Sequence, residues 1–378
     1  MNLELTEDQE FFRDTTRKFL TSEAPLTAVR DLYEEADGFH PDWWQQAAQL
    51  GWTTFFVDES LGGGSLSGRP TGDAVIVAEE MGRLVSPGPF LPVNVVAAAM
   101  SWFGSSAQQQ EILPGLLSGD AVATWAFAER GRAWSTQSIQ TTLRTDGGDV
   151  VLDGEKTYVE AVGVADHLLV TALSDDGVAN VLVPAATAGV SITRGRSIDM
   201  TRRFGTVTFD GARLPASAVV GELDQGAAAV ERLLTLALAL QCAEMVGVAD
   251  RTLEFTLEYG ADRFAFGRPV VSFQVLKHRI ADMTVALEGS KAVADDLAAA
   301  VDERRPDAAR LASVAKAYVG EHCLDIVDDC VQITGGIGVT WEHDIHLYNR
   351  RAAVDRAVYG TPEEHKARLI SLLEEAQA

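Results

Sequence analysis

Two segments rich in arginine and glycine are the parts of this chain whose residue types and spacing could support chemistry. One runs from Arg263 to Pro269 and the other from Gln332 to Thr340, and both are expected to lie between long helices. The commoner signatures are absent, because the sequence has no GxGxxG after a strand, no GxxxxGK and no GxSxG. A dinucleotide-binding fold, a P-loop and a hydrolase nucleophile elbow are therefore not supported.

A pair of histidines invites a metal-binding interpretation, which the spacing does not favour. His343 and His346 lack the HxxxH arrangement of a helical zinc site, and no cysteine lies beside them. The three cysteines, Cys242, Cys323 and Cys330, are odd in number and have no CxxC spacing, which indicates buried thiols in a reducing compartment. We predict no metal site and a cytoplasmic protein.

Composition and charge disfavour two classes of partner. The chain has 378 residues, of which 47% are apolar, and a net charge of -24. Nucleic-acid binding depends on Lys and Arg neutralising phosphates, so an acidic chain is a poor candidate for it. The longest apolar stretch, Leu233 to Leu240, is far shorter than the ~20 residues that a membrane span needs. Met1 to Glu7 also lack the basic and apolar regions of a signal peptide.

The pattern along the chain predicts an α+β fold in three segments. Residues 1–120 are expected to form an N-terminal α-helical domain that opens with a capping box at Thr6. Residues 121–222 contain short β-rich runs separated by turn residues, which favours a middle antiparallel β domain. Residues 223–378 are expected to form a C-terminal α-helical bundle.

Four motifs, in this order along the chain, resemble those of the acyl-CoA dehydrogenase family. The third motif, Arg263 to Pro269, matches the family's RxxFGxP signature and is followed here by Ser272-Phe273-Gln274 and Ala281-Asp282-Met283. The resemblance covers essentially the whole chain and includes the α–β–α order. The motifs are Glu59 to Gly63, Glu79 to Arg83, Arg263 to Pro269, and Gln332 to Thr340.

The resemblance implies a cofactor, a substrate and a reaction. Members of the family hold FAD between subunits and place an acyl-CoA thioester beside the flavin. They desaturate the Cα–Cβ bond by removing a proton and transferring a hydride to the flavin, and they pass the electrons to an electron-transferring flavoprotein. A CoA thioester is anionic, so its binding to this acidic chain requires a local basic cluster.

Three residues of the third motif match family positions that contact FAD. Arg263 resembles the arginine that reaches the pyrophosphate across the dimer, and a planar guanidinium suits phosphate. The alternative for Arg263 is a surface ion pair. Phe266 and Gln274 match positions beside the adenosine half of FAD, although Phe266 fits ordinary core packing equally well.

The other predicted cofactor residues come from the fourth motif and from the β domain. Gln332, Gly335 and Gly336 match a stretch where the backbone approaches the FAD of the other subunit, and a helix C-cap there is compatible with that role. The resemblance also places Phe127 and Tyr158 at the flavin. Packing within the β domain is the alternative for Tyr158.

The flavin-facing β segments depart from the family pattern. The TEP motif appears as Ala128-Glu129-Arg130, which loses the threonine hydroxyl near the flavin. Glu160 stands where a family threonine hydrogen-bonds to the flavin. The sequence therefore does not support that contact.

The usual catalytic base is also missing. In many members the base is the glutamate of an IYEGT motif, and Gly360 occupies the position of that glutamate here. In another subset the glutamate base lies at the position that Ala237 fills in this chain. Glu244 lies on the same helix face as Ala237, about 10.5 Å further along the axis, on an apolar stripe that should raise its pKa. We predict that Glu244 removes the α-proton of the thioester, with a buried glutamate tied to a neighbouring helix as the alternative.

One further resemblance concerns the type of assembly. Thr340 to Tyr348 is similar to an actinobacterial subgroup that includes enzymes for CoA thioesters of steroid side chains and ring remnants. Many of these are α2β2 heterotetramers in which only one of two unlike subunits supplies the base. Three functions follow: an active subunit that uses Glu244, in a homo-oligomer or a heterotetramer; a catalytically silent subunit that completes the FAD site of a paralogue; or non-redox chemistry on CoA thioesters, such as hydration.

Overall fold

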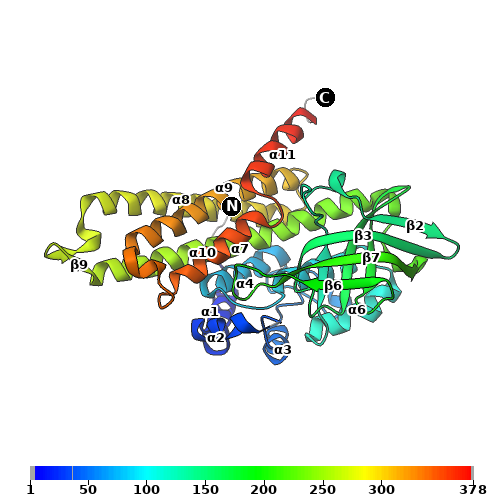
Figure 1. Cartoon of the computed structure of the whole chain (residues 1–378), viewed down its shortest axis with the longest axis horizontal. Coiled ribbons are helices and arrows are strands. Elements are labelled where there is room, and N and C mark those ends of the chain that lie inside the picture. The colour runs from blue at the N-terminus through cyan, green and yellow to red at the C-terminus, as the bar shows by residue number, and fades with distance from the viewer. Residues whose placement is uncertain (1–4, 36, 376–378) are drawn as a thin grey trace.

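The computed structural model describes residues 5–35 and 37–375, and its helical, β and helical segments follow one another as predicted (Figure 1). Residues 1–4, which belong to the segment expected not to form a signal peptide, lie outside this range. The molecule is elongated, with a helical bundle towards one end and the sheet at the other (Figure 1). The C-terminal helix projects from the body.

The N-terminal segment is a group of helices around an aromatic core. The helix α1 (Glu7–Glu23) begins at the predicted capping box, in which the Thr6 hydroxyl accepts a hydrogen bond from the backbone N–H of Gln9. Trp44 and Trp52 are fully buried. The remaining helices are α2 (Leu26–Asp31), η1 (Leu32–Glu34), α3 (Pro41–Gln49), η2 (Glu59–Leu61), α4 (Pro70–Leu84), α5 (Phe90–Phe103) and α6 (Ser106–Ser118).

The middle segment forms one sheet in the order β6-β7-β3-β2-β4-β5-β8, with β1 paired to β4. Most pairs are antiparallel as predicted, but β1 and β2 both run parallel to β4. A parallel pair needs a long crossover, and the chain that includes β3 supplies it for both pairs. The strands are β1 (Ala123–Ala126), β2 (Thr142–Asp146), β3 (Asp149–Glu160), β4 (His167–Ser174), β5 (Gly177–Pro184), β6 (Val190–Arg194), β7 (Phe204–Pro215) and β8 (Val219–Val220).

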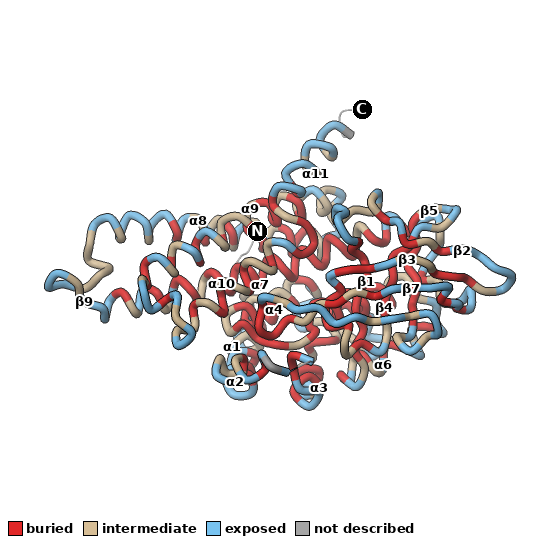
Figure 2. The backbone as a smooth tube through the Cα atoms, in the orientation of Figure 1, coloured by how far each residue is buried: buried red, intermediate tan, exposed pale blue. Residues whose placement is uncertain are grey.

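The helix α7 (Gly226–Asp262) forms the centre of the C-terminal segment (Figures 1 and 2). It is long and apolar enough to cross a membrane, but 94% of its most apolar window is buried inside the fold, so it is a core helix. Gly82 of α4 and Gly247 of α7 let the two helices touch, because a Cβ on either would lie 2.0 Å from a carbonyl oxygen of the opposite helix. The other helices are α8 (Gln274–Asp302), α9 (Ala308–Thr334), η7 (Gly335–Val339), α10 (Ile345–Ala357) and α11 (Pro362–Glu375).

A short hairpin caps the end of α7 that lies farthest from the sheet (Figure 1). Its strands are β9 (Phe264–Ala265) and β10 (Arg268–Pro269), and the two residues between them, Phe266 and Gly267, both have positive φ. This is the backbone of a tight two-residue hairpin turn. The same helix therefore joins the third sequence motif at one end to the β domain at the other.

Candidate active site

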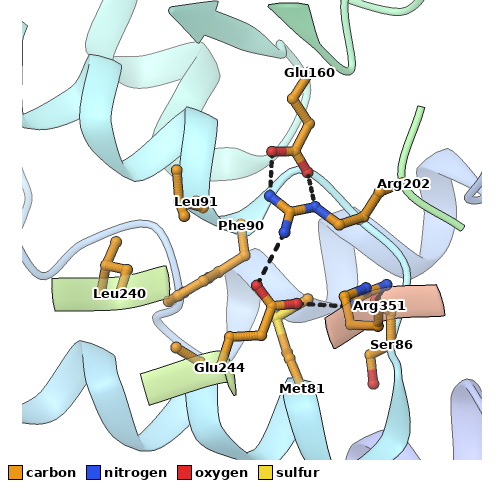
Figure 3. A pocket seen from close by; sticks show the side chains of 11 residues that line it. Met81, Ser86, Phe90, Leu91, Glu160, Arg202, Leu240, Glu244 and Arg351 are labelled. Atoms are coloured by element: carbon orange, nitrogen blue, oxygen red, sulfur yellow. Dashed lines mark hydrogen bonds and ion pairs between the residues drawn. The ribbon is translucent and has the colours of Figure 1, made fainter. Parts of the chain in front are cut away.

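The side chain of Glu244 lies in the buried region where α7, α10, the end of β3 and the β6–β7 loop meet (Figure 3). The cavity there has a volume of about 20 Å³, which is room for about one water molecule. Its walls include Met81, Phe90 and Leu91 from α4 and α5. An acyl group does not fit in a space of this size.

Two guanidinium groups hold the carboxylate of Glu244. Arg351 of α10 donates to one oxygen, and Arg202 of the β6–β7 loop lies 3.4 Å from the other (Figure 3). Glu244 itself is 7% exposed. The apolar stripe expected beside this glutamate is present, because Ala237 and Leu240 are buried on the same helix. The two arginines come from other elements, so the structure has the arrangement that we gave as the alternative, a buried glutamate tied to neighbouring elements.

Three further carboxylates complete a buried ion network. Glu160 accepts two hydrogen bonds from Arg202, at 2.7 and 2.5 Å, and Asp355 of α10 also accepts from Arg202. Asp199 accepts from Arg351, and this contact holds the pKa of Asp199 below its usual value although burial acts in the opposite direction. The network thus joins the β domain to α7 and α10, which are distant in sequence.

The network contains more acids than bases. Glu160, Asp199, Glu244 and Asp355 face the guanidiniums of Arg202 and Arg351, which are all buried. Burial and the neighbouring Glu244 raise the pKa of Asp355 well above its usual value, and its Oδ2 has no hydrogen-bond partner among the described residues. Nearby, burial lowers the pKa of Lys316 to about 8.

The two usual positions of the base are closed to a glutamate. Gly360 has a φ of 101°, which favours glycine, and a Cβ there would lie 2.8 Å from Nε2 of His365. His365 is buried and bonded to the hydroxyl of Ser313 and the carbonyl of Tyr359. Ala237 is fully buried in α7.

Aromatic side chains fill the space beside Gly360. The ring centroids of Trp134 and Tyr359 are 5.0 Å apart, and Phe127 stacks on Trp125 at 4.7 Å. Phe127 is buried, whereas Tyr158, on the other side of Trp134, is 58% exposed. Of the two residues that we placed at the flavin, only Tyr158 has a free ring face.

The altered TEP motif has a structural role here. Glu129 accepts hydrogen bonds from the backbone N–H groups of Gln140 and Thr141 and from the ammonium of Lys156, at 2.8 Å each. Lys156 is fully buried, and burial lowers its pKa to about 8. The pair fixes the loop between β1 and β2 to β3.

The residues of the third motif lie far from this network. Arg263, Phe266 and Gln274 are exposed at the hairpin end of α7, and Phe266 is 97% exposed. Glu244 and Arg263 are separated along α7 by about 28 Å, at the usual rise per residue. A cofactor held at the hairpin could therefore not also reach Glu244 of the same chain through this helix face.

The fourth motif forms an open turn at the end of α9. Gly335 has a φ of 72°, and a Cβ on Gly335 or Gly336 would meet nothing within 4 Å. Gln332 is exposed as well. The glycines leave this backbone accessible to a large ligand or another subunit, and a C-cap at Gly335 is present as expected.

A larger cavity of about 910 Å³ lies between α5, α7 and the α8–α9 turn. Arg232 stacks over Trp102 at 3.7 Å, and burial and the charge of Arg304 lower the pKa of Arg232. Within the described residues, neither of these arginines has an ion pair, whereas the lining acids Glu231 and Asp302 have donors. This is a local basic cluster of the kind that an anionic ligand requires.

Comparison with known proteins identifies the family. Family models described as the N-terminal, middle and C-terminal domains of acyl-CoA dehydrogenase match residues 6–120, 124–212 and 224–371. The chain belongs to the acyl-CoA dehydrogenase family. This is a family of oxidoreductases that act on the CH–CH group of acyl-CoA, and FAD is its cofactor.

The relatives include one solved structure whose name refers to a steroid acyl-CoA dehydrogenase. Acyl-CoA dehydrogenase IpdE2 from Mycolicibacterium smegmatis is 30% identical over 97% of this chain and 98% of its own length. A chain of the ChsE4-ChsE5 complex from Mycobacterium tuberculosis is 27% identical, with a TM-score of 0.89 over 99% of this chain and 99% of its own length. A steroid acyl-CoA dehydrogenase, Tcur3481-Tcur3483, is 28% identical, with a TM-score of 0.88 over 98% of this chain and 99% of its own.

The two ends of α7 differ in how well they fit FAD. The hairpin and the open glycine turn offer exposed arginine, aromatic and backbone groups, which suit the diphosphate and adenosine parts. At the other end, Glu160 is bonded to Arg202 and Trp134 covers Tyr359. Of the residues that the resemblance places at the flavin ring, Glu160 and Phe127 are therefore engaged inside the fold, and only Tyr158 keeps an exposed ring.

Sequence reasoning did not find the partners of Glu244. Arg202 and Arg351 were not singled out, although each sits next to a second arginine in the sequence. Arg351 and Asp355 also lie one helical turn apart on α10. That spacing shows that the two share a helix face, but it does not show that the face is buried.

Proposed function

We propose that this chain is a catalytically silent subunit of a heteromeric acyl-CoA dehydrogenase. In this proposal its hairpin end completes the FAD site of a paralogous subunit, which carries the base and desaturates the thioester. The electrons pass from that subunit to an electron-transferring flavoprotein. The chain therefore takes part in an oxidation that its own pocket does not perform.

The observation that carries the proposal is the ion network in place of an acyl pocket. The remaining cavity of about 20 Å³ is lined by charged groups of Glu160, Arg202, Glu244 and Arg351. Breaking such a buried pair leaves an uncompensated charge and costs about 3–5 kcal/mol. To admit a substrate, several of these buried ion pairs would have to break, and each would carry this cost in free energy.

The residues at and near the usual positions of the catalytic base also support a silent subunit. Two guanidiniums occupy the carboxylate oxygens of Glu244, so neither oxygen is free to approach the α-proton of a thioester. Gly360 cannot be exchanged for a glutamate without displacing His365. A silent subunit has no need of either position.

The substrate class is part of the proposal. The name of one solved relative, a steroid acyl-CoA dehydrogenase, together with the resemblance of Thr340 to Tyr348 to the steroid subgroup, favours a bulky, steroid-derived CoA thioester. The complex named ChsE4-ChsE5 contains two chains, which favours an unlike partner here. We expect an α2β2 assembly in the cytoplasm.

The test is to express the chain alone and together with a paralogue encoded beside it. Flavin absorbance and mass are then measured on each product. We expect a colourless product from the single chain and a yellow heteromer from the pair. A yellow homo-oligomer that oxidises acyl-CoA would refute the proposal.

A second candidate function is an active subunit that uses Glu244. It is favoured by the arginine-lined cavity of about 910 Å³, because Arg232 and Arg304 could bind the phosphates of a CoA thioester. In this case Glu244 must exchange its guanidinium partners for the substrate.

The variant Glu244→Gln separates the two candidates, because the amide keeps the shape and removes the base. The active subunit predicts loss of acyl-CoA oxidation in the assembled complex by a hundredfold or more, as expected for general base catalysis. The silent subunit predicts a change of only a few fold. The mass of the complex shows whether the variant still assembles.

A further inference from the structure

The hairpin end of α7 carries an uninterrupted basic segment. Residues 263–279 include Arg263, Arg268, Lys277 and Arg279 and contain no aspartate or glutamate, in a chain whose net charge is -24. Arg279 is ion-paired with Asp329 of α9. The other three cations have no ion pair among the described residues.

The strand register places Arg263 and Arg268 on one face of the hairpin. Arg268 lies opposite Ala265, and the ladder continues with a hydrogen bond from the backbone N–H of Val270 to the carbonyl of Arg263. Residues that are diagonal to each other across an antiparallel pair are about 7–8 Å apart on the same face. Two arginine side chains at this separation can bind the same diphosphate.

The side chain of Arg268 is held in place by an aromatic ring. Its guanidinium lies 4.0 Å from the ring centre of Phe273, and Phe266 meets the edge of the same ring at 6.3 Å. A cation–π contact at an exposed site contributes about 0.5–1 kcal/mol and leaves the N–H groups at the rim of the guanidinium free. Arg268 is therefore oriented without being neutralised.

We propose that Arg268 is a second cationic ligand, beside Arg263, for the diphosphate of the FAD that the partner subunit holds. This inference rests on the proposed role of the hairpin end. A diphosphate carries charge on several oxygens, and a pair of planar guanidiniums can each donate two hydrogen bonds to it. Arg268 thereby contributes to cofactor affinity without touching the reacting atoms.

The experiment measures the dissociation constant of FAD from the assembled complex at two salt concentrations. The variants are Arg268→Gln, Arg263→Gln and Arg268→Lys, and the control is Arg144→Gln. Arg144 lies on β2 at the other end of the molecule and is an exposed arginine paired with Asp153. The mass of each complex is measured to confirm assembly.

We expect Arg268→Gln to weaken FAD binding about tenfold and to reduce its dependence on salt. Arg268→Lys should fall between Arg268→Gln and the unchanged protein, because it keeps the charge and loses the planar fork. Arg144→Gln should change neither quantity. A role limited to hairpin stability would lower the melting temperature and leave the salt dependence unchanged, which would overturn the inference.

The outcome for Arg263 separates this inference from the proposed function. If Arg263→Gln weakens FAD binding and Arg268→Gln does not, the role of Arg268 is wrong and the role of the hairpin end stands. If neither variant weakens FAD binding, the hairpin end does not bind the partner's cofactor, and both proposals fail.

Discussion

Replacing Asp355 by asparagine should change how the stability of this protein depends on pH. Asp355 is fully buried and accepts a hydrogen bond from Arg202, while its Oδ2 has no partner among the described residues. The groups around it are Glu244, Gln241 and Cys242 on α7, Glu160 on β3, Asp199 and Arg202 in the β6–β7 loop, Arg351 on its own helix, and Lys316 on α9.

The direction of the effect follows from the pKa of Asp355. Burial and Glu244 raise it well above the usual value, so the folded protein holds a proton here that the unfolded chain releases near pH 3.9. A group whose pKa is raised by folding stabilises the folded state fully at pH values below its unfolded pKa. This stabilisation is lost as the pH rises towards the pKa in the folded state. The free energy of unfolding should therefore fall with pH across this window.

The magnitude is set by one proton. Each pH unit between the two pKa values changes the free energy of unfolding by about 1.36 kcal/mol. Between pH 5.0 and pH 6.5 the unchanged protein should lose about 1.36 kcal/mol relative to Asp355→Asn for each pH unit in which folded Asp355 keeps its proton, because asparagine resembles the protonated acid at every pH. Lys316 does not contribute in this window, since its pKa of about 8 lies above it.

The assay is chemical denaturation of the assembled protein at both pH values, with Asp175→Asn as the exposed control. Burial raises the pKa of Glu79 to about 7 and lowers that of His365 to about 4, but both groups are present in each protein and cancel in the difference. Parallel stability curves for the variant and the unchanged protein would show that Asp355 is ionised, and the reasoning about the surplus acid would be wrong.

Three further predictions concern single positions. Gly360→Glu in the complex should not enable this subunit to oxidise acyl-CoA, because a Cβ at position 360 would lie 2.8 Å from His365. The assay is flavin bleaching by substrate in a complex whose partner subunit has been inactivated, and bleaching there would contradict this expectation. Gly82→Ala should lower the free energy of unfolding by about 1–3 kcal/mol, since the new methyl group would overlap the carbonyl oxygen of Glu244. Denaturant unfolding measures this loss, and a change below about 0.5 kcal/mol would refute the tight contact. Lys156→Met should cost about 3–5 kcal/mol by leaving Glu129 buried without its cation; an unchanged melting temperature would show that the pair is not important.

Part of the candidate site could be read from the sequence because it depends on local patterns. The segment Arg263 to Pro269 stands out by its family motif, and the structure forms a hairpin there with Phe266 and Gly267 at its tip. The glycines at 335 and 336 likewise form an open turn. The loss of a base at Gly360 and Ala237 is also a property of the sequence alone.

The environment of Glu244 could not be read in this way. The helical period places Glu244 on the same face as Ala237, but it does not say what packs against that face. Arg202 is 42 residues away in the chain and Arg351 is 107 residues away, and each comes from a different structural element. Their approach depends on how the β6–β7 loop and α10 meet α7.

The sequence by itself determined the family, the order of helical and β segments, the two arginine- and glycine-rich motifs and the absence of a glutamate at the usual positions. These features depend on residue type and on short-range spacing. Only the tertiary structure decided that Glu244 is an ion-paired glutamate and that the cavity beside it has room for about one water molecule. The physical reason is that a buried carboxylate takes its chemistry from the charges that surround it, and here those charges come from segments far apart along the chain.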